Sequence, residues 1–264
     1  MFKNTAPIGV MDSGVGGLSV VQALKSELPC EDIIYYGDTA NCPYGNKTKD
    51  ELLGLSSNML RFLQKQGVKC VALACNTTSS LADLLRPQFE VPIITVAECA
   101  ADAIVRTKIK AVGLIATRFT VASGIYEKRI HAVDAAVKVR SIGSPDLARL
   151  VEHCAPDDPK VKAEISTCMA GLLEDPDIRD VILGCTHYPL VLQQFMECCP
   201  GIRFIDPAPH QARVVREFLA SEQMLHTQQA PKLTVYTTGS PEPFQRICAE
   251  NGLSDFYDTK FIQI

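Results

Sequence analysis

The strongest constraint on the fold is the regular alternation of short apolar runs with stretches of helical periodicity. Seven runs have the length and composition of buried strands: residues 8–11, 32–37, 70–75, 92–96, 111–116, 137–142 and 180–185. Between two of them, apolar residues recur at helical spacing over 49–66, and Gly67 follows as an expected C-cap. Strands that alternate with helices predict an α/β fold built on parallel sheets.

Two of the strand-like runs continue in the same way. The stretches "VALACNTTSS" (71–80) and "VILGCTHYPL" (181–190) each read as an apolar strand, a small residue, a cysteine, polar residues and the start of a helix. This half-repeat predicts two α/β halves, each presenting one cysteine at the carboxyl end of a strand. Ligands bind at that edge of an open parallel sheet.

The composition is that of an ordinary globular protein and disfavours several partners. The 264 residues carry a formal net charge of -4 without long runs of like charge, which argues against nucleic acid or an anionic membrane surface as a partner. The first residues lack the apolar core of a signal peptide, and no apolar run is long enough to span a bilayer, so we expect a cytoplasmic protein. The eleven cysteines are irregularly spaced, which favours free thiols over a disulfide framework.

A glycine-rich turn, "DSGVGG" (12–17), follows the first predicted strand. A dinucleotide-binding motif starting at Gly14 would need Gly or Ala where this chain has Ser19, and a Walker lysine is also missing. We interpret the turn as one that lets a ligand approach the backbone, with Asp12 as an anionic acceptor and Ser13 as a hydroxyl.

A second turn, "GDTANCPYG" (37–45), follows the second predicted strand. Tyr44 and Gly45 are candidates to line a pocket. The alternative is an ordinary turn in which Asp38 and Thr39 hydrogen-bond to their own backbone.

Three interpretations compete for the cysteines: structural thiols, metal or redox ligands, and catalytic thiols. No C-x-x-C occurs, and His187 lies two residues from Cys185 with no matching histidine near Cys75, so a metal framework is disfavoured. Cys75 and Cys185 instead lie where a strand ends and a helix is expected to begin, a position that favours a thiolate. A structural role suits the cysteines inside apolar runs, namely Cys30, Cys70, Cys99, Cys168 and Cys248.

The residues around the two thiols suggest a proton-transfer site. Asn76, Thr77 and Thr186 offer hydrogen bonds for a carboxylate, His187 can exchange a proton with Cys185 or with a substrate carboxylate, and Asp12 can polarise the other thiol. Two facing thiols suit a reaction that removes a proton from one face of a carbon and returns one to the other, which is racemisation or epimerisation. A Cys-His-acid hydrolase needs only one cysteine, so the duplication argues against acyl transfer.

Four motifs together closely resemble those of the glutamate racemases, which belong to the cofactor-independent aspartate/glutamate racemase family. They are "IGVMDSGVGGLSV", "YYGDTANCPYG", "ALACNTTSS" and "LGCTHYPL". They occur in the order found in that family, and the resemblance spans almost the whole chain. It implies direct interconversion of L- and D-glutamate without cofactor, metal or nucleotide, supplying D-glutamate for bacterial peptidoglycan, cell wall biogenesis and cell shape.

The resemblance also implies roles for individual residues. It makes Cys75 and Cys185 the two acid/base residues, with His187 assisting Cys185, Asp12 beside the first thiol and Glu152 as an acid near the second. The implied substrate-binding positions are Asp12, Ser13, Tyr44, Gly45, Asn76, Thr77, Thr117, Thr120, Thr186 and His187. The departures from the family pattern are Met11, where phenylalanine is common, Asn41, where arginine is common, Thr78, where alanine is usual, and the pair His153 and Cys154, where small residues are common.

The implied fold consists of two pseudo-symmetric α/β domains, each a mostly parallel sheet flanked by helices, with the active site in the cleft between them. We place the first domain at residues 1–97 plus 208–264 and the second at 98–207. A homodimer is the family expectation. Two rivals remain: an aspartate racemase or related cysteine-dependent isomerase of the same group, and a non-catalytic amino-acid-binding module, against which the paired cysteines argue.

Overall fold

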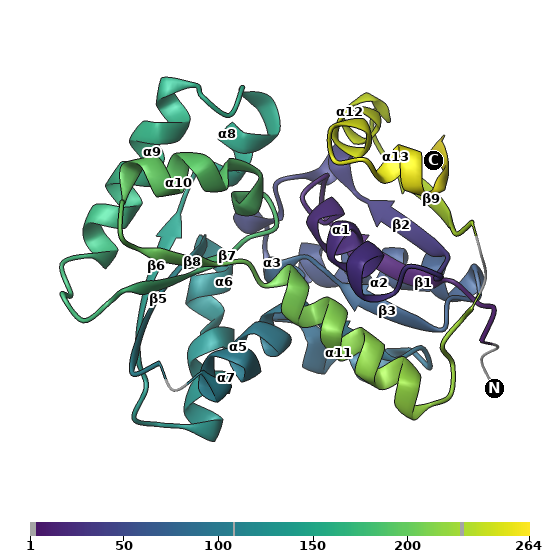
Figure 1. Ribbon diagram of the computed structural model, residues 1–264, viewed down its shortest axis with the longest axis horizontal. Helices are drawn as coiled ribbons and strands as arrows, with labels where there is room; N and C mark the ends of the chain where they lie inside the picture. Colours follow the sequence, from purple (N-terminus) through teal and green to yellow (C-terminus); the bar gives the residue numbers. More distant parts are fainter. Residues whose placement is uncertain (1–3, 108, 228–229) are drawn as a thin grey trace.

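The protein is built on two parallel β-sheets that form two lobes, as the computed structural model shows (Figure 1). The structure describes residues 4–107, 109–227 and 230–264. The larger sheet has the strand order β10-β9-β2-β1-β3-β4 and the smaller has the order β6-β5-β7-β8. All described strand pairs in both sheets are parallel. The α/β prediction is therefore confirmed.

The first half contains the larger sheet and the helices packed on it. Its strands are β1 (Ile8–Asp12), β2 (Ile33–Gly37), β3 (Cys70–Leu73), β4 (Ile93–Thr95), β9 (Lys232–Thr237) and β10 (Asp258–Gln263). Its helices are α1 (Leu18–Glu27), η1 (Thr39–Asn41), η2 (Tyr44–Asn46), α2 (Lys49–Lys65), α3 (Asn76–Ser79), α4 (Ala82–Leu85), η3 (Arg86–Gln88), α11 (Ala208–Ser221), α12 (Glu242–Glu250) and α13 (Leu253–Phe256).

The second half contains the smaller sheet. Its strands are β5 (Ala111–Thr117), β6 (Lys138–Ser144), β7 (Asp180–Gly184) and β8 (Arg203–Ile205). Its helices are α5 (Val96–Arg106), α6 (Arg118–Ser123), α7 (Ile125–Val133), α8 (Leu147–His153), α9 (Pro159–Leu172), η4 (Tyr188–Val191) and α10 (Leu192–Cys198).

The two halves repeat the same strand order around their first strand. The chain passes from β1 to β2 on one side and then to β3 on the other, and it passes from β5 to β6 and then to β7 in the same way. In an open parallel sheet, ligands bind where the strand order reverses, at the carboxyl ends of the strands. These positions are the ends of β1 and β3 in one half and of β5 and β7 in the other.

Helices cover both faces of each sheet, because the central strands are apolar on both sides. In the first half, one buried cluster lies under α1, α11 and α12 and another under α2 and α4. In the second half, one cluster lies under α8, α9 and α10 and another under α5 and α7. Helices α5 and α11 also pack against each other and so join the two halves.

Helix α2 shows how local sequence sets the element boundaries. Thr48 and Glu51 form a capping box at its start. Its buried face includes Leu52 and Leu63. Gly67 follows its end with a φ of +74°, a conformation that glycine adopts without strain, as the sequence predicts.

All seven predicted strands are present, with boundaries shifted by one or two residues. Strands β8, β9 and β10 were not predicted. Because β9 and β10 extend the larger sheet, the sheet memberships support the placement of the C-terminal part with the first half. The division into 1–97 plus 208–264 and 98–207 stays a proposal; its cuts fall within α5 and at the start of α11.

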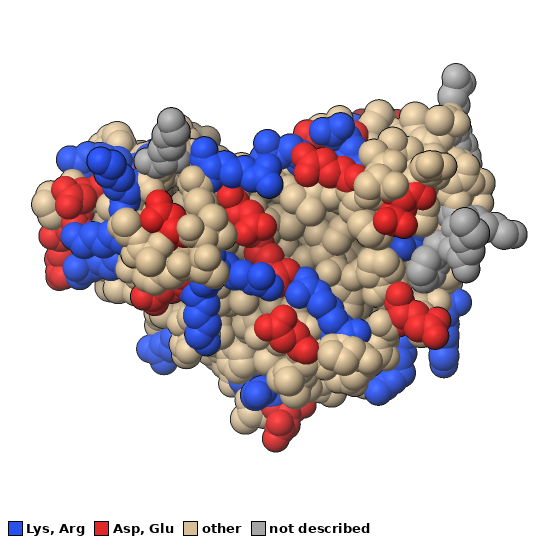
Figure 2. Space-filling view, turned by 90° about the horizontal axis from the view of Figure 1, so that it is seen from below, with Lys and Arg blue, Asp and Glu red and all other residues tan. Residues whose placement is uncertain are grey.

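The surface carries charges of both signs. On the face shown in Figure 2, basic and acidic side chains are interspersed without a large area of one sign. Within the described ranges, no helix combines the length and apolarity that a membrane crossing requires.

Candidate active site

Cys75 and Cys185 come from different halves and line the same cavity. Cys75 follows β3 and is the N-cap of α3, and Cys185 directly follows β7. Their exposed fractions are 4% and 6%. The cavity between them has a volume of about 20 Å³.

The cavity is lined by most of the residues that the sequence singled out. The lining consists of Ser13, Cys42, Pro43, Tyr44, Gly45, Cys75, Asn76, Thr77, Thr117, Ala148, Cys185, Thr186 and His187. Asp12, Thr120 and Glu152 are absent from this lining, and each bonds a residue that belongs to it. Cys42, Pro43 and Ala148 were not predicted.

Around the first thiol, a buried hydroxyl and a buried carboxylate approach from the glycine-rich turn. The Cys75 Sγ lies 3.7 Å from Ser13 Oγ. The Asp12 carboxylate accepts hydrogen bonds from Gly14 N (3.1 Å) and from Thr186 Oγ1 (3.1 Å), so it links the two halves. Burial raises the pKa of Asp12 to about 6, although the charge of His187 and these hydrogen bonds oppose the shift.

The resting state of Cys75 differs from the expectation. Its position before a helix was predicted to favour a thiolate, but burial and the nearby charge of Asp12 raise the pKa of the thiol to about 11. Helix α3 has only four residues, so its dipole is too small to offset the loss of solvation. Cys75 is therefore a thiol at neutral pH until something removes its proton.

The second thiol is connected to a histidine and a glutamate. Cys185 Sγ lies 3.7 Å from His187 Nδ1, and His187 Nε2 makes a short hydrogen bond with the Glu152 carboxylate. Burial alone would lower the pKa of His187, but its hydrogen bonds to Cys185, Cys42 and Glu152 outweigh it and hold this pKa well above the ordinary value. Burial likewise opposes ionisation of Glu152, yet the hydrogen bond to His187 keeps its pKa below the ordinary value. His187 and Glu152 thus form a buried ion pair.

The segment after Cys185 also departs from expectation. Where the sequence predicted a helix start, the structure has a turn over Thr186 and His187 and then the short 3-10 helix η4, with Pro189 near its start. The first α-helix after this thiol is α10, which begins at Leu192. The two cysteines therefore have similar positions but different local backbones.

Hydroxyl and amide groups from both halves meet across the cleft. Thr77 Oγ1 lies 3.0 Å from Thr117 Oγ1, which in turn lies 2.9 Å from Thr120 Oγ1. Tyr126 Oη donates to Asn76 Oδ1 at 2.6 Å. Such a cluster can hold a carboxylate group when the cleft takes up a ligand. The Tyr44 hydroxyl is occupied elsewhere, because it donates to Asp38 Oδ2 at 2.6 Å.

Glycines of the first and second turns allow the halves to touch. A Cβ at Gly16 would lie 2.6 Å from Thr186 Oγ1 and 2.8 Å from His187 N. A Cβ at Gly45 would lie 2.8 Å from Thr117 Cβ. At these positions only a glycine permits the observed approach of the backbone to the opposite half.

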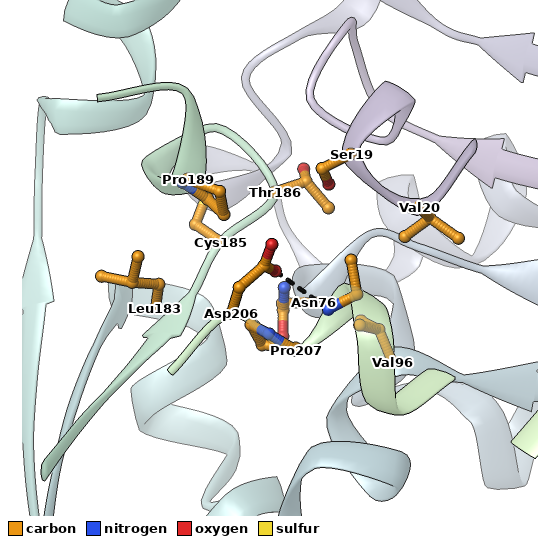
Figure 3. Close-up of a pocket in the computed structure, with 11 residues that line it drawn as sticks. Ser19, Val20, Asn76, Val96, Leu183, Cys185, Thr186, Pro189, Asp206 and Pro207 are labelled. Carbon is orange, nitrogen blue, oxygen red and sulfur yellow. Dashed lines mark hydrogen bonds between the residues drawn. The ribbon is translucent and has the colours of Figure 1, made fainter. Parts of the chain in front are cut away.

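A second, smaller cavity of about 10 Å³ shares Asn76, Cys185 and Thr186 with the first (Figure 3). The Asp206 side chain points into it, and its carboxylate accepts a hydrogen bond from Ala208 N at 2.9 Å. Its lining includes Cys185 but not Cys75. We therefore assign the ligand site to the first cavity, which both thiols line.

The paired thiols, the histidine–carboxylate pair and the cluster of hydroxyls thus lie where the two α/β halves meet. Comparison with known proteins specifies the family. The chain belongs to the Asp/Glu/hydantoin racemase family, whose model matches residues 8–215.

Individual relatives cover almost the whole chain. The glutamate racemase of Thermoanaerobacter pseudethanolicus is 35% identical over 243 residues, which are 91% of each chain. The crystal structure of glutamate racemase isoform RacE1 from Bacillus anthracis matches with a TM-score of 0.90 at 32% identity, covering 99% of this chain and 98% of that one. Glutamate racemase from Francisella tularensis in complex with D-glutamate matches with a TM-score of 0.88 at 29% identity, covering 99% and 97%.

Proposed function

We propose that this protein is a glutamate racemase that interconverts L- and D-glutamate by a two-cysteine proton transfer at the α-carbon. The observation that carries the proposal is the shared cavity between Cys75 and Cys185, in a chain that is 35% identical to a glutamate racemase over 91% of its length. The product supplies peptidoglycan synthesis in the cytoplasm of a bacterium. A homodimer stays a prediction.

The proposed reaction moves one proton off the substrate and another onto it. The thiolate of one cysteine takes the α-proton and becomes a thiol, and the thiol of the other donates its proton to the opposite face of the α-carbon and becomes a thiolate. The negative charge passes from one sulfur to the other through the carbanion. The reverse reaction exchanges the two roles, so no cofactor enters the balance.

Different residues exchange protons with the two thiols or stabilise their charge. Asp12 and Ser13 serve Cys75, and Asp12 can receive the thiol proton because its raised pKa makes it a stronger base than an ordinary carboxylate. His187, held by Glu152, serves Cys185 as a cation that can stabilise a thiolate or donate a proton. The hydroxyl cluster and Asn76 bind the substrate carboxylates.

The cleft must open to admit this substrate. A cavity of about 20 Å³ has room for about one water molecule. Glutamate is much larger, so we expect the halves to separate and then close around it. Closure removes water from the thiols, which strengthens every charge interaction in the site.

Solvent isotope exchange tests the proposal. With L-glutamate in deuterated water and no added cofactor, we expect optical rotation to decay to zero while deuterium enters the α-position. L-aspartate, run in parallel, should exchange much more slowly. Faster exchange with aspartate would identify an aspartate racemase, and binding of glutamate without exchange would identify a non-catalytic module.

The raised pKa of Asp12 predicts the acidic limb of the pH profile. We expect kcat/KM to fall as the pH drops through about 6, where Asp12 gains a proton and ceases to act as a base. Asp12→Asn should lower kcat/KM by about 10²-fold or more and remove this limb. The measurement is kcat/KM from pH 5 to 8, roughly the range around this pKa. Asp83→Asn changes a carboxylate that is 85% exposed and should leave the profile unchanged.

The raised pKa of Asp12 also predicts how the stability of the fold depends on pH. The folded state holds the Asp12 proton up to about pH 6, whereas an ordinary aspartate loses it near 3.8. The stabilisation from protonated Asp12 is therefore complete below the ordinary pKa and is lost as the pH rises through about 6. Urea unfolding of Asp12→Asn should lack this loss. If the free energy of unfolding of Asp12→Asn changes with pH as that of the wild type does, the raised pKa does not belong to Asp12.

A further inference from the structure

Cys42, Glu152 and His187 form a cluster of potential metal ligands beside the paired thiols. Their ligand atoms all lie within 4.8 Å of one another. Cys42 comes from the loop after η1, Glu152 from α8 and His187 from the segment after β7. Cys42 contacts His187, but the proposed transfer moves no proton through Cys42.

The space among these atoms depends on a glycine. A Cβ at Gly14 would lie 3.3 Å from each of Cys42 Sγ, Glu152 Oε2 and His187 Nε2. The three side chains therefore converge on one point beside the backbone of the glycine-rich turn. Any larger residue at position 14 would fill this point.

The dimensions suit a small cation. In a triangle with sides of at most 4.8 Å, a central ion lies within about 2.8 Å of each corner, against roughly 2.0–2.3 Å for zinc bonds to nitrogen, oxygen and sulfur. Small side-chain rotations would close the difference. The short contact between His187 Nε2 and Glu152 would be exchanged for one bond from each group to the ion.

The donor set selects the kind of ion. One thiolate, one imidazole and one carboxylate are typical ligands of Zn²⁺ and related first-row transition metals, and they disfavour Mg²⁺ or Ca²⁺. His187 Nδ1 is held 3.7 Å from Cys185 Sγ, so Nε2 is directed at the other two ligands. Three protein ligands leave a fourth position for water.

The cluster also has a route to the surface. Cys42 and Glu152 line a third cavity, of about 200 Å³, together with Arg149, His153 and Ser240. This cavity is distinct from the one between the thiols, and Cys42 belongs to the walls of both. An ion can therefore reach Cys42 and Glu152 without passing between Cys75 and Cys185.

We propose that Cys42, Glu152 and His187 form an inhibitory site for Zn²⁺. A bound ion would hold Nε2 of His187 and separate it from Glu152. His187 would then be a neutral imidazole that keeps only its Nδ1 proton, which makes it a much weaker acid toward Cys185 than the imidazolium. Inhibition, though not binding, rests on the proposed racemase function. The ion would act as a regulator or inhibitor and takes no part in the reaction.

The test combines binding with activity in the full-length protein. Purified protein, kept reduced with a phosphine instead of a thiol, is titrated with Zn²⁺ by calorimetry and with Co²⁺ by absorption spectroscopy. We expect one equivalent to bind, a thiolate-to-cobalt charge-transfer band to appear, and glutamate racemisation to be inhibited and then restored by a chelator.

Cys42→Ser is the critical variant. It should lose the charge-transfer band and weaken Zn²⁺ binding more than about 100-fold, because the loss of an outer partner alone costs about 10–100-fold. Inhibition of the Cys42→Ser protein by Zn²⁺ is expressed relative to the rate of the same variant without metal. Cys154→Ser is the matched control, since Cys154 is half-buried, lies two residues from Glu152 and is outside the cluster; it should behave like the wild type.

The possible outcomes test the proposed Zn²⁺ site and the proposed racemase activity independently. Absence of Zn²⁺ binding, or a charge-transfer band that survives in Cys42→Ser and disappears in Cys185→Ser, would overturn the proposed site. Equal inhibition of Cys42→Ser and wild type would overturn it as well. Binding through Cys42 in a protein that does not racemise glutamate would overturn the proposed function and leave the metal site in place.

Discussion

Replacing either Cys75 or Cys185 with alanine is expected to lower kcat/KM for glutamate racemisation by at least about 10²–10⁴-fold, the usual contribution of a positioned general acid or base. Each thiol serves one face of the α-carbon, so neither can substitute for the other. The measurement is the decay of optical rotation from each enantiomer, with circular dichroism and urea unfolding to verify the fold.

The chain offers matched controls for these two changes. Cys70 is fully buried in β3, the strand that precedes Cys75, and Cys199 is 8% exposed in the second half. Cys70→Ala and Cys199→Ala remove a buried thiol outside the cavity and should retain activity. A Cys75→Ala or Cys185→Ala protein that racemises within tenfold of wild type would remove that cysteine from the mechanism.

Gly16→Ala is expected to lower kcat/KM by about 10²-fold, the effect of misplacing reacting groups by roughly 1 Å. The added Cβ would lie 2.7 Å from the Thr186 carbonyl carbon and 2.8 Å from His187 N, and backbone atoms cannot rotate away. The halves would have to shift apart, which moves Cys185 relative to Cys75. Steady-state kinetics with both enantiomers measures the loss.

A second glycine provides the control. Gly54 lies inside α2, and a Cβ there meets nothing within 4 Å. Gly54→Ala should keep full activity and raise the free energy of unfolding by about 0.5–1 kcal/mol, because alanine is the better helix former. Wild-type activity in Gly16→Ala would show that the contact with Thr186 is not needed for catalysis.

Most of the fold could be predicted because the strands of the two sheet centres are continuous apolar runs. The strands that were missed lack this signal. β8 and β10 are both edge strands: β8 contains no buried residue, and the residues of β10 are mostly exposed and include Asp258 and Lys260. An edge strand buries little side-chain surface, so its sequence carries little pattern.

Only those parts of the candidate site that lie within one short segment of the sequence could be predicted. Cys75 with Asn76 and Thr77, and Cys185 with Thr186 and His187, are short local motifs. Cys42 meets Glu152 and His187 only through the tertiary fold, so no spacing in the sequence indicates the cluster. The protonation of Cys75 was misjudged for a related reason, since burial is a property of the folded chain.

The two thiols have unlike neighbours: Asp12 and Ser13 on one side, His187 and Glu152 on the other. Mirror-image substrates nevertheless have identical free energies in water, so the equilibrium constant of their interconversion is unity at every pH. The Haldane relation then requires kcat/KM to be the same for both enantiomers, however different the two bases are. The unlike neighbours can therefore change kcat and KM only together. The enantiomer with the lower KM must have a kcat that is lower by the same factor.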